Sequence, residues 1–127
     1  MIFDKNLVFG ENKALTASGI IGEAIDMSVA NPNIGAGSKK FLAVVINTPL
    51  GSGASDGTVK FHIQDAATDT ATPVTIQSGK QYSEGDLAAN DIVLIPIPDE
   101  VQRYVSAYAE LGGTSPTITV SAYIYVQ

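Results

Sequence analysis

His62 is the one histidine in the 127-residue sequence, and histidine is the side chain best suited to acid–base chemistry near neutral pH. It lies between Phe61 and Ile63 in a segment of alternating polarity. The chain offers no second histidine to share a metal ion and no glycine-flanked nucleophile for His62 to activate. We therefore expect His62 to be a surface or partly covered residue of a β-sheet, without a catalytic role.

Carboxylates are the other groups that could carry chemistry. Asp99 with Glu100, or Asp65 with Asp69, could bind calcium or act as acid and base, but neither pair has the alternating oxygen spacing of a calcium loop. The glycine-rich segment 51–57 lacks the lysine and following helix of a phosphate-binding loop. Because there is no cysteine, thiolate metal sites and cysteine nucleophiles are excluded. The sequence predicts no catalytic residue, no metal site, no cofactor and no enzymatic activity.

The charge balance narrows the range of partners. Seven basic against 13 acidic residues give a formal net charge of −6, so a surface that follows nucleic-acid phosphates is not expected. Lys39 and Lys40 form the only adjacent basic pair, which suits either a solvated strand start or a salt-sensitive contact to an acidic partner. Asp4 and Lys5 interrupt the first apolar segment, and no apolar run approaches about 18 residues, so we expect a soluble chain without a membrane segment.

Period-two alternation and turn-forming clusters predict short strands along most of the chain. The run 41–48 is continuously apolar, as in a strand covered on both faces, and is expected to stop at Pro49. Pro96 indicates a sheet edge or a strand end, and residues 83–90 also suit a single helical turn. The expected strands are 23–29, 41–48, 58–65, 73–79, 91–98, 103–111 and 117–126.

Seven or eight short strands at nearly even spacing predict an all-β fold. We expect an antiparallel β-sandwich of jelly-roll or Greek-key type, with residues 1–127 forming a single domain. The loops 31–40 and 50–57 are rich in glycine, serine and asparagine but too short to link domains.

Four tyrosines near the C-terminus raise the question of a binding surface. Alternation places Tyr104 and Tyr108 on the polar face of one expected strand, and Tyr123 and Tyr125 on the polar face of the next. If a four-residue loop, 112–115, joins the two strands as a hairpin, all four phenols share one face. Tyrosine combines apolar area with a hydrogen-bonding group, so this face predicts either a protein–protein contact between copies of the chain or a solvated sheet surface steadied by aromatic pairs.

Two terminal segments resemble a known family. The opening MIFDKNLVF with ALTASG, and the ending RYVSAYAELGGTSPTITVSAYI, resemble tailed-phage capsid cement proteins, typified by the jelly-roll cement protein of a Bordetella phage; the middle segment ASDGTVKFHIQDA is compatible with that family. The resemblance implies a non-enzymatic decoration protein on the outer capsid surface of the virion. Its partners would be the major capsid protein, whose neighbouring subunits it bridges, and further copies of itself in a homo-oligomer, with a dimer favoured and a trimer possible.

A different class of function remains open. A receptor-binding or carbohydrate-binding β-sandwich would also present tyrosines on a sheet face, although sugar platforms usually use tryptophan and this chain has none. For the cement function, we expect the loops 31–40 and 50–57 and the strand edges to contact the shell, with the loops moulding to it. The expected interface residues are Tyr104, Tyr108, Tyr123, Tyr125, Lys39 and Lys40.

Overall fold

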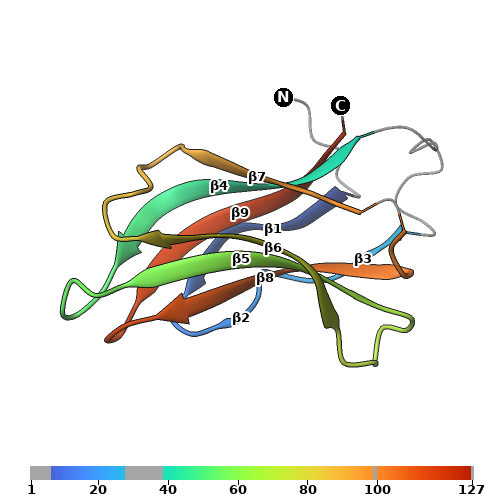
Figure 1. The fold of residues 1–127 in the computed structure, drawn as a ribbon, viewed down its shortest axis with the longest axis horizontal. Helices are drawn as coiled ribbons and strands as arrows, with labels where there is room; N and C mark the ends of the chain where they lie inside the picture. The colour runs from blue at the N-terminus through green and yellow to red at the C-terminus, as the bar shows by residue number, and fades with distance from the viewer. Residues whose placement is uncertain (1–6, 28–38, 99, 127) are drawn as a thin grey trace.

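The computed structural model describes residues 7–27, 39–98 and 100–126, and these residues form two antiparallel sheets packed face to face (Figure 1). In the four-stranded sheet the order is β1 (Val8–Leu15), β9 (Thr117–Val126), β4 (Lys40–Gly51) and β7 (Ile92–Pro96). In the five-stranded sheet it is β2 (Gly19–Ile20), β8 (Tyr104–Gly112), β5 (Thr58–Ala66) and β6 (Val74–Ser83), with β3 (Ile25–Asp26) also paired to β8.

The chain crosses repeatedly between the two sheets. It leaves β1 for β2 and β3, returns to β4, crosses to the β5–β6 hairpin, returns to β7, and then crosses to β8 and back to β9. This double Greek key is the jelly-roll arrangement. The predicted all-β antiparallel sandwich of a single domain is confirmed.

Inward-facing side chains of both sheets make one core. On β4, Leu42, Val44 and Ile46 are fully buried, while Phe41 and Val45, which point to the other face, are half-buried. The same alternation on β8 and β9 buries Val105, Ala107, Ala109, Ile118, Val120, Ala122 and Ile124. Each large apolar side chain removed from water contributes about 1.5–3 kcal/mol, so this pattern fixes which face of each strand lies inside.

Several strand boundaries differ from those expected. β4 continues through Pro49 to Gly51, and the expected strand 23–29 is limited to Ile25–Asp26 among the described residues. Residues 83–90 form turns and not a helical turn, because Asp86 accepts from the N–H of Ser83 at 2.8 Å and closes a turn there. Pro96 ends the edge strand β7, as its lack of a backbone donor indicated.

One glycine lets the β2–β3 connection pass close to β1. Gly22 has a positive φ of 69°, and a Cβ at this position would lie 2.1 Å from the carbonyl oxygen of Phe9. On either side, the N–H of Ile21 donates to Ala107 O at 2.8 Å and the N–H of Glu23 donates to Phe9 O at 3.0 Å. The bare backbone of Gly22 therefore lets the β2–β3 connection lie directly against the first strand.

Candidate protein-interaction surfaces

The four tyrosines do not share a surface, because the expected hairpin between β8 and β9 does not exist. β8 pairs with β5, β2 and β3, whereas β9 pairs with β1 and β4, in the other sheet. The alternation along each strand is as expected, but the GGTSP connection crosses between the sheets. Tyr104 and Tyr108 thus lie on the outer face of the five-stranded sheet, and Tyr123 and Tyr125 lie on the opposite side of the sandwich.

The outer face of the four-stranded sheet carries no charged side chain across three of its strands. Backbone pairing aligns Pro96, Phe41 and Tyr125 in one row, and Leu94, Ala43 and Tyr123 in the next. A third row joins Ile92, Val45 and Ser121. We name these nine residues the uncharged face: Phe41, Ala43, Val45, Ile92, Leu94, Pro96, Ser121, Tyr123 and Tyr125.

Large apolar side chains of the uncharged face remain open to solvent. Ile92 and Leu94 are each 47% exposed, and the rings of Phe41 and Tyr125 lie 6.3 Å apart between centroids. Ala43 is fully buried although it points outward, because Tyr123 and Leu94 flank it on the neighbouring strands. An aromatic and aliphatic surface depleted of charge has the composition of an interface core.

Sequence reasoning missed Ile92 and Leu94 as surface residues. The segment DIVLIPIP is predicted to be a strand, and its period of two already places Ile92, Leu94 and Pro96 on one face. What the sequence did not reveal is which strands flank β7. Only the pairing with β4 shows that this apolar row continues the surface of Tyr123 and Tyr125.

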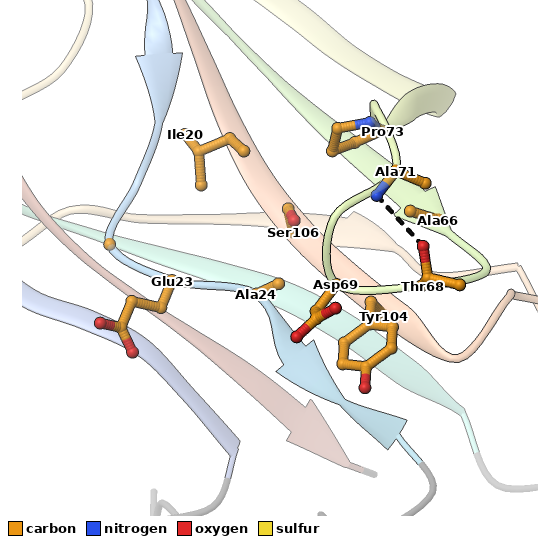
Figure 2. Close-up of a pocket in the computed structure, with 11 residues that line it drawn as sticks. Ile20, Glu23, Ala24, Ala66, Thr68, Asp69, Ala71, Pro73, Tyr104 and Ser106 are labelled. Atoms are coloured by element: carbon orange, nitrogen blue, oxygen red, sulfur yellow. Dashed lines mark hydrogen bonds between the residues drawn. The ribbon is translucent and has the colours of Figure 1, made fainter.

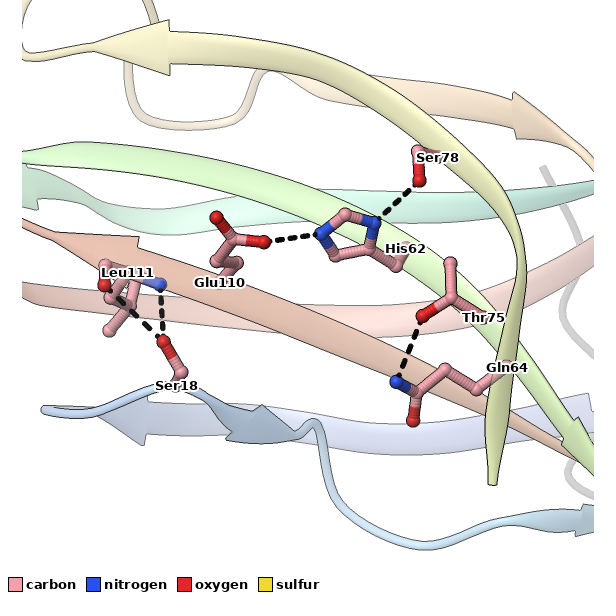
Figure 3. A network of polar contacts seen from close by, with 7 residues as sticks. All are labelled: Ser18, His62, Gln64, Thr75, Ser78, Glu110 and Leu111. Carbon is pink, nitrogen blue, oxygen red and sulfur yellow. Dashed lines mark hydrogen bonds and ion pairs between the residues drawn. The ribbon is translucent and has the colours of Figure 1, made fainter. Parts of the chain in front are cut away.

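The outer face of the five-stranded sheet is polar by contrast (Figure 3). His62 on β5 contacts Ser78 Oγ on β6 through Nδ1 at 2.8 Å, and Glu110 Oε1 on β8 through Nε2 at 3.0 Å. Only 7% of His62 is exposed, so it is more deeply covered than expected. Gln64 donates to Thr75 Oγ1 at 3.2 Å beside it. These contacts join three neighbouring strands through their side chains.

The two tyrosines on this polar face each lie against another side chain. Tyr108 lies next to His62, with ring centroids 6.0 Å apart. The guanidinium of Arg103 lies over the ring of Tyr104 at 5.2 Å. Arg103 also donates to both carboxylate oxygens of Asp26 at 2.9 Å, and this hydrogen bonding and charge raise the pKa of Arg103 further above its ordinary value.

Lys39 precedes β4 and Lys40 is its first residue, paired with Val126 and therefore one position from the Phe41–Tyr125 pair. Lys39 is exposed, whereas Lys40 is half-buried and its carbonyl accepts from the N–H of Ile97 at 2.9 Å. The region described shows no salt bridge for either lysine. Most of the expected contact loop 31–40 lies outside the described residues.

The second expected contact loop, 50–57, forms hydrogen bonds to neighbouring loops. Leu50 is buried at the end of β4. Beyond it, Gly53 N–H donates to Thr114 O at 2.7 Å, and Gly57 N–H donates to Glu84 Oε2 at 2.7 Å. Asp56 accepts from the Thr114 N–H and hydroxyl, and the Thr114 backbone hydrogen bond is the main cause that lowers the Asp56 pKa.

A cleft of about 310 Å³ opens on the outer side of β8 (Figure 2). Tyr104 and Ser106 lie at its base. One wall is the β2–β3 connection with Glu23, and the other is the β5–β6 loop with Thr68 and Asp69. A hydrogen bond from Ala71 N–H to Thr68 Oγ1, at 3.1 Å, shapes this loop.

The carboxylates considered for metal binding do not lie together in one site. Asp65 is buried and accepts from the N–H of Gln102 at 2.9 Å, whereas Asp69 lines the cleft; Asp99 lies outside the described residues. Within the segments that the structure describes, no group of three or more acidic or histidine side chains could hold a metal ion. The same segments contain no helix long and apolar enough to cross a membrane.

The fold and its surfaces define a jelly-roll β-sandwich with one uncharged outer face and one polar outer face. The chain belongs to the Bbp16 family, whose model matches residues 9–124. The family name resembles that of a Bordetella phage protein, so the family is phage-related, in agreement with the resemblance of the terminal segments. A comparison with curated proteins finds none that matches the chain.

Proposed function

We propose that this chain is a capsid cement protein that binds the outer surface of a phage shell and bridges neighbouring major capsid protein subunits. Membership of a phage-related family supports a virion role. The observation that carries the proposal is the uncharged face: a chain of net charge −6 exposes Ile92 and Leu94 on a charge-free sheet surface suited to a protein partner. The proposal includes no enzymatic, nucleic-acid-binding or membrane-binding activity.

A cement protein needs two separate binding surfaces, and the sandwich offers two outer faces on opposite sides. Packaged DNA exerts pressure that opens a shell at the seams between capsid subunits. A protein that holds both sides of a seam opposes this opening without catalysing a reaction. When one oligomer engages several subunits, modest single contacts combine into tight attachment.

In this proposal the uncharged face joins two copies of the chain. A two-fold contact would place Phe41, Tyr123 and Tyr125 of one copy against the same surface of the other, and a standard interface would cover about 800 Å² on each. A dimer is favoured, because a two-fold contact uses the same surface on both copies. A trimer is the alternative closed arrangement.

The polar face and the loop ends are then left for the major capsid protein. Tyr104 and Tyr108 supply aromatic area on that side, among groups that can form hydrogen bonds. Lys39 and Lys40 would add a salt-sensitive contact to an acidic region of the shell. The loop 50–57 would meet the shell as a preformed surface, because Asp56 and Thr114 already fix its shape.

The decisive experiment compares particles with and without this protein. Phage shells stripped of the chain are reloaded with purified protein, washed, and heated while DNA release is followed by a dye excluded from intact heads. We expect bound protein at a fixed copy number per shell and a higher temperature of DNA release. Absence of binding to mature shells, or unchanged release temperature at full loading, would replace the cement proposal with the receptor-binding alternative.

A further inference from the structure

The cleft on the outer side of β8 has the size and lining of a site for one long side chain. Its volume of about 310 Å³ is at the lower end of the roughly 300–1,000 Å³ of ligand sites, so it is too small for an extended sugar chain. Small apolar groups cover part of its wall, and polar groups stand at its base and rim. The apolar lining residues are Ile20, Ala24, Ala66, Ala71 and Pro73.

Each of the two walls contains an acidic residue, although in Figure 2 the Glu23 carboxylate points away from Ser106 and Asp69. Glu23 belongs to the β2–β3 connection, and Asp69 belongs to the β5–β6 loop (Figure 2). Both side chains are exposed, and neither forms a salt bridge within the described parts of the chain. Nearby, Asp26 already binds the guanidinium of Arg103 in a two-bond pair. Asp69 also interacts electrostatically with Arg103, which balances part of its charge, and Glu23 and Asp69 together still leave the rim of the cleft acidic.

Ser106 gives an independent indication of a ligand. The residue is only 2% exposed, yet it points to the outer side of β8 and lines the cleft. No hydrogen bond joins its hydroxyl to another described residue. Since every side-chain nitrogen or oxygen sealed from solvent in the described chain has a partner, the Ser106 hydroxyl must open into the cleft. A hydroxyl that opens into the cleft and has no partner among the described residues can accept a hydrogen bond from a ligand.

We propose that this cleft binds the side chain of a lysine from a partner protein. The methylene chain would lie along Ala66, Ala71 and Pro73, as lysine stems commonly cover apolar surface. The ammonium would donate to Asp69 and Ser106, and Glu23 would add negative charge near the entrance. Arginine fits less well, because its planar group prefers both oxygens of one carboxylate.

The proposal does not depend on the cement function, since a lysine can come from any protein partner. It can be tested on the free protein with Nα-acetyl-lysine N-methylamide as the probe, by following backbone amide signals in NMR titrations. We expect saturable shifts confined to residues 20–24, 66–73 and 104–106, with a Kd on the order of millimolar for a single side chain.

Matched compounds and variants make the test specific. Nα-acetyl-norleucine N-methylamide has an apolar chain without the charge, and should not saturate. Asp69→Asn and Ser106→Ala should each weaken lysine binding, by about tenfold for the lost charged partner, whereas Glu11→Gln, on the other sheet, removes the same charge and should have no effect. Retained signal dispersion shows that each variant is folded.

Four results would overturn the proposal. Equal binding of the norleucine compound would make the cleft a simple apolar site. Saturable binding of N-acetylglucosamine at these residues, without lysine binding, would assign the cleft to a sugar. Tighter binding of the arginine analogue would assign it to a guanidinium. Equal weakening by Asp69→Asn and Glu11→Gln would show that only net charge attracts the probe.

Discussion

Asp56 and Thr114 connect two loops that are far apart in sequence: the Asp56 carboxylate accepts from the Thr114 N–H at 2.9 Å and from its hydroxyl at 3.0 Å. The Ser52 hydroxyl also lies 3.2 Å from Asp56 Oδ1 and 2.5 Å from Glu84 Oε2, so its single proton can be donated to either carboxylate. The β4–β5 loop is thereby fixed against the β8–β9 loop at one end of the sandwich. Because these hydrogen bonds favour the ionised carboxylate, the Asp56 pKa is lowered below its ordinary value of 3.8.

This lowered pKa predicts a pH-dependent contribution to stability. A carboxylate with a lower pKa in the folded state stabilises the fold above the unfolded pKa, and this contribution is lost as the pH falls through the folded pKa. We expect wild type to be more stable than Asp56→Asn at pH 6, and the difference to shrink as the pH falls below about 3.8. Urea unfolding of both proteins at pH 6 and pH 3 measures this difference in stability.

The control for this prediction is Glu11→Gln, which removes an exposed negative charge from β1. Its stability difference from wild type should change much less over the same range. An Asp56→Asn difference that stays constant or grows on acidification would show that Asp56 contributes through its shape and not its charge.

The fold class could be predicted from sequence because apolar and polar side chains alternate with a period of two along β5, β8 and β9. The same alternation correctly divided inward from outward residues on β8 and β9. It failed for β1, where the strand bulges twice against β9 and Asn12 takes a positive φ of 49°, so the apolar period is interrupted.

Strand partners, in contrast, could not be predicted. A short loop rich in glycine and serine suits a hairpin, and the GGTSP segment met that description. In the fold, Gly113 has a φ of 101° and lies against the Asp56 carbonyl, as part of a crossing between sheets. The tyrosine surface depended on that single pairing, which is why it was wrong while the direction of each tyrosine was right.

His62→Gln should destabilise the protein by about 1–2 kcal/mol, although we expect no catalytic loss. His62 is buried and bonds to Ser78 and Glu110, and a shorter amide cannot keep both contacts at the same positions. Glu110→Gln should cost less, about 0–1 kcal/mol, because the Glu110 side chain is 58% exposed. Chemical unfolding of the two variants measures the loss of stability that each substitution causes. Equal effects would mean that the contact to Ser78 contributes little.

Gly22→Ala should destabilise the fold by at least about 2 kcal/mol. A methyl group there would adopt a strained positive φ of 69° and would lie 2.1 Å from Phe9 O, which is held by the hydrogen bond from Glu23. Gly85→Ala is the matched variant, because Gly85 has a φ of 89° but nothing within 4 Å of an added Cβ. It isolates the backbone strain at about 1 kcal/mol.

Thermal and urea unfolding of the two glycine variants give the comparison. A cost at Gly22 that matches the cost at Gly85 would show that the β2–β3 connection shifts away from β1 without resistance. In that case the close approach at Phe9 does not help to hold the β2–β3 connection against β1.

The final prediction concerns the uncharged face and the proposed dimer. Replacing both Ile92 and Leu94 by threonine places a β-branched residue suited to a strand at each position but removes apolar area. Since both side chains are 47% exposed in one copy, the stability of the monomer should change little. Association through this face should weaken by at least about tenfold, because two copies lose four apolar contacts around the two-fold axis.

Sedimentation velocity over a range of concentrations measures this change, with Val74→Thr as the control. Val74 is an equally apolar residue, 62% exposed, on β6 of the other sheet, so its replacement should leave self-association intact. If Val74→Thr loses the oligomer while the Ile92 and Leu94 variant keeps it, the contact between copies lies on the five-stranded sheet. A wild-type chain that stays monomeric at the highest concentration would leave the uncharged face to the shell, so that bridging would have to come from a single copy holding two capsid subunits.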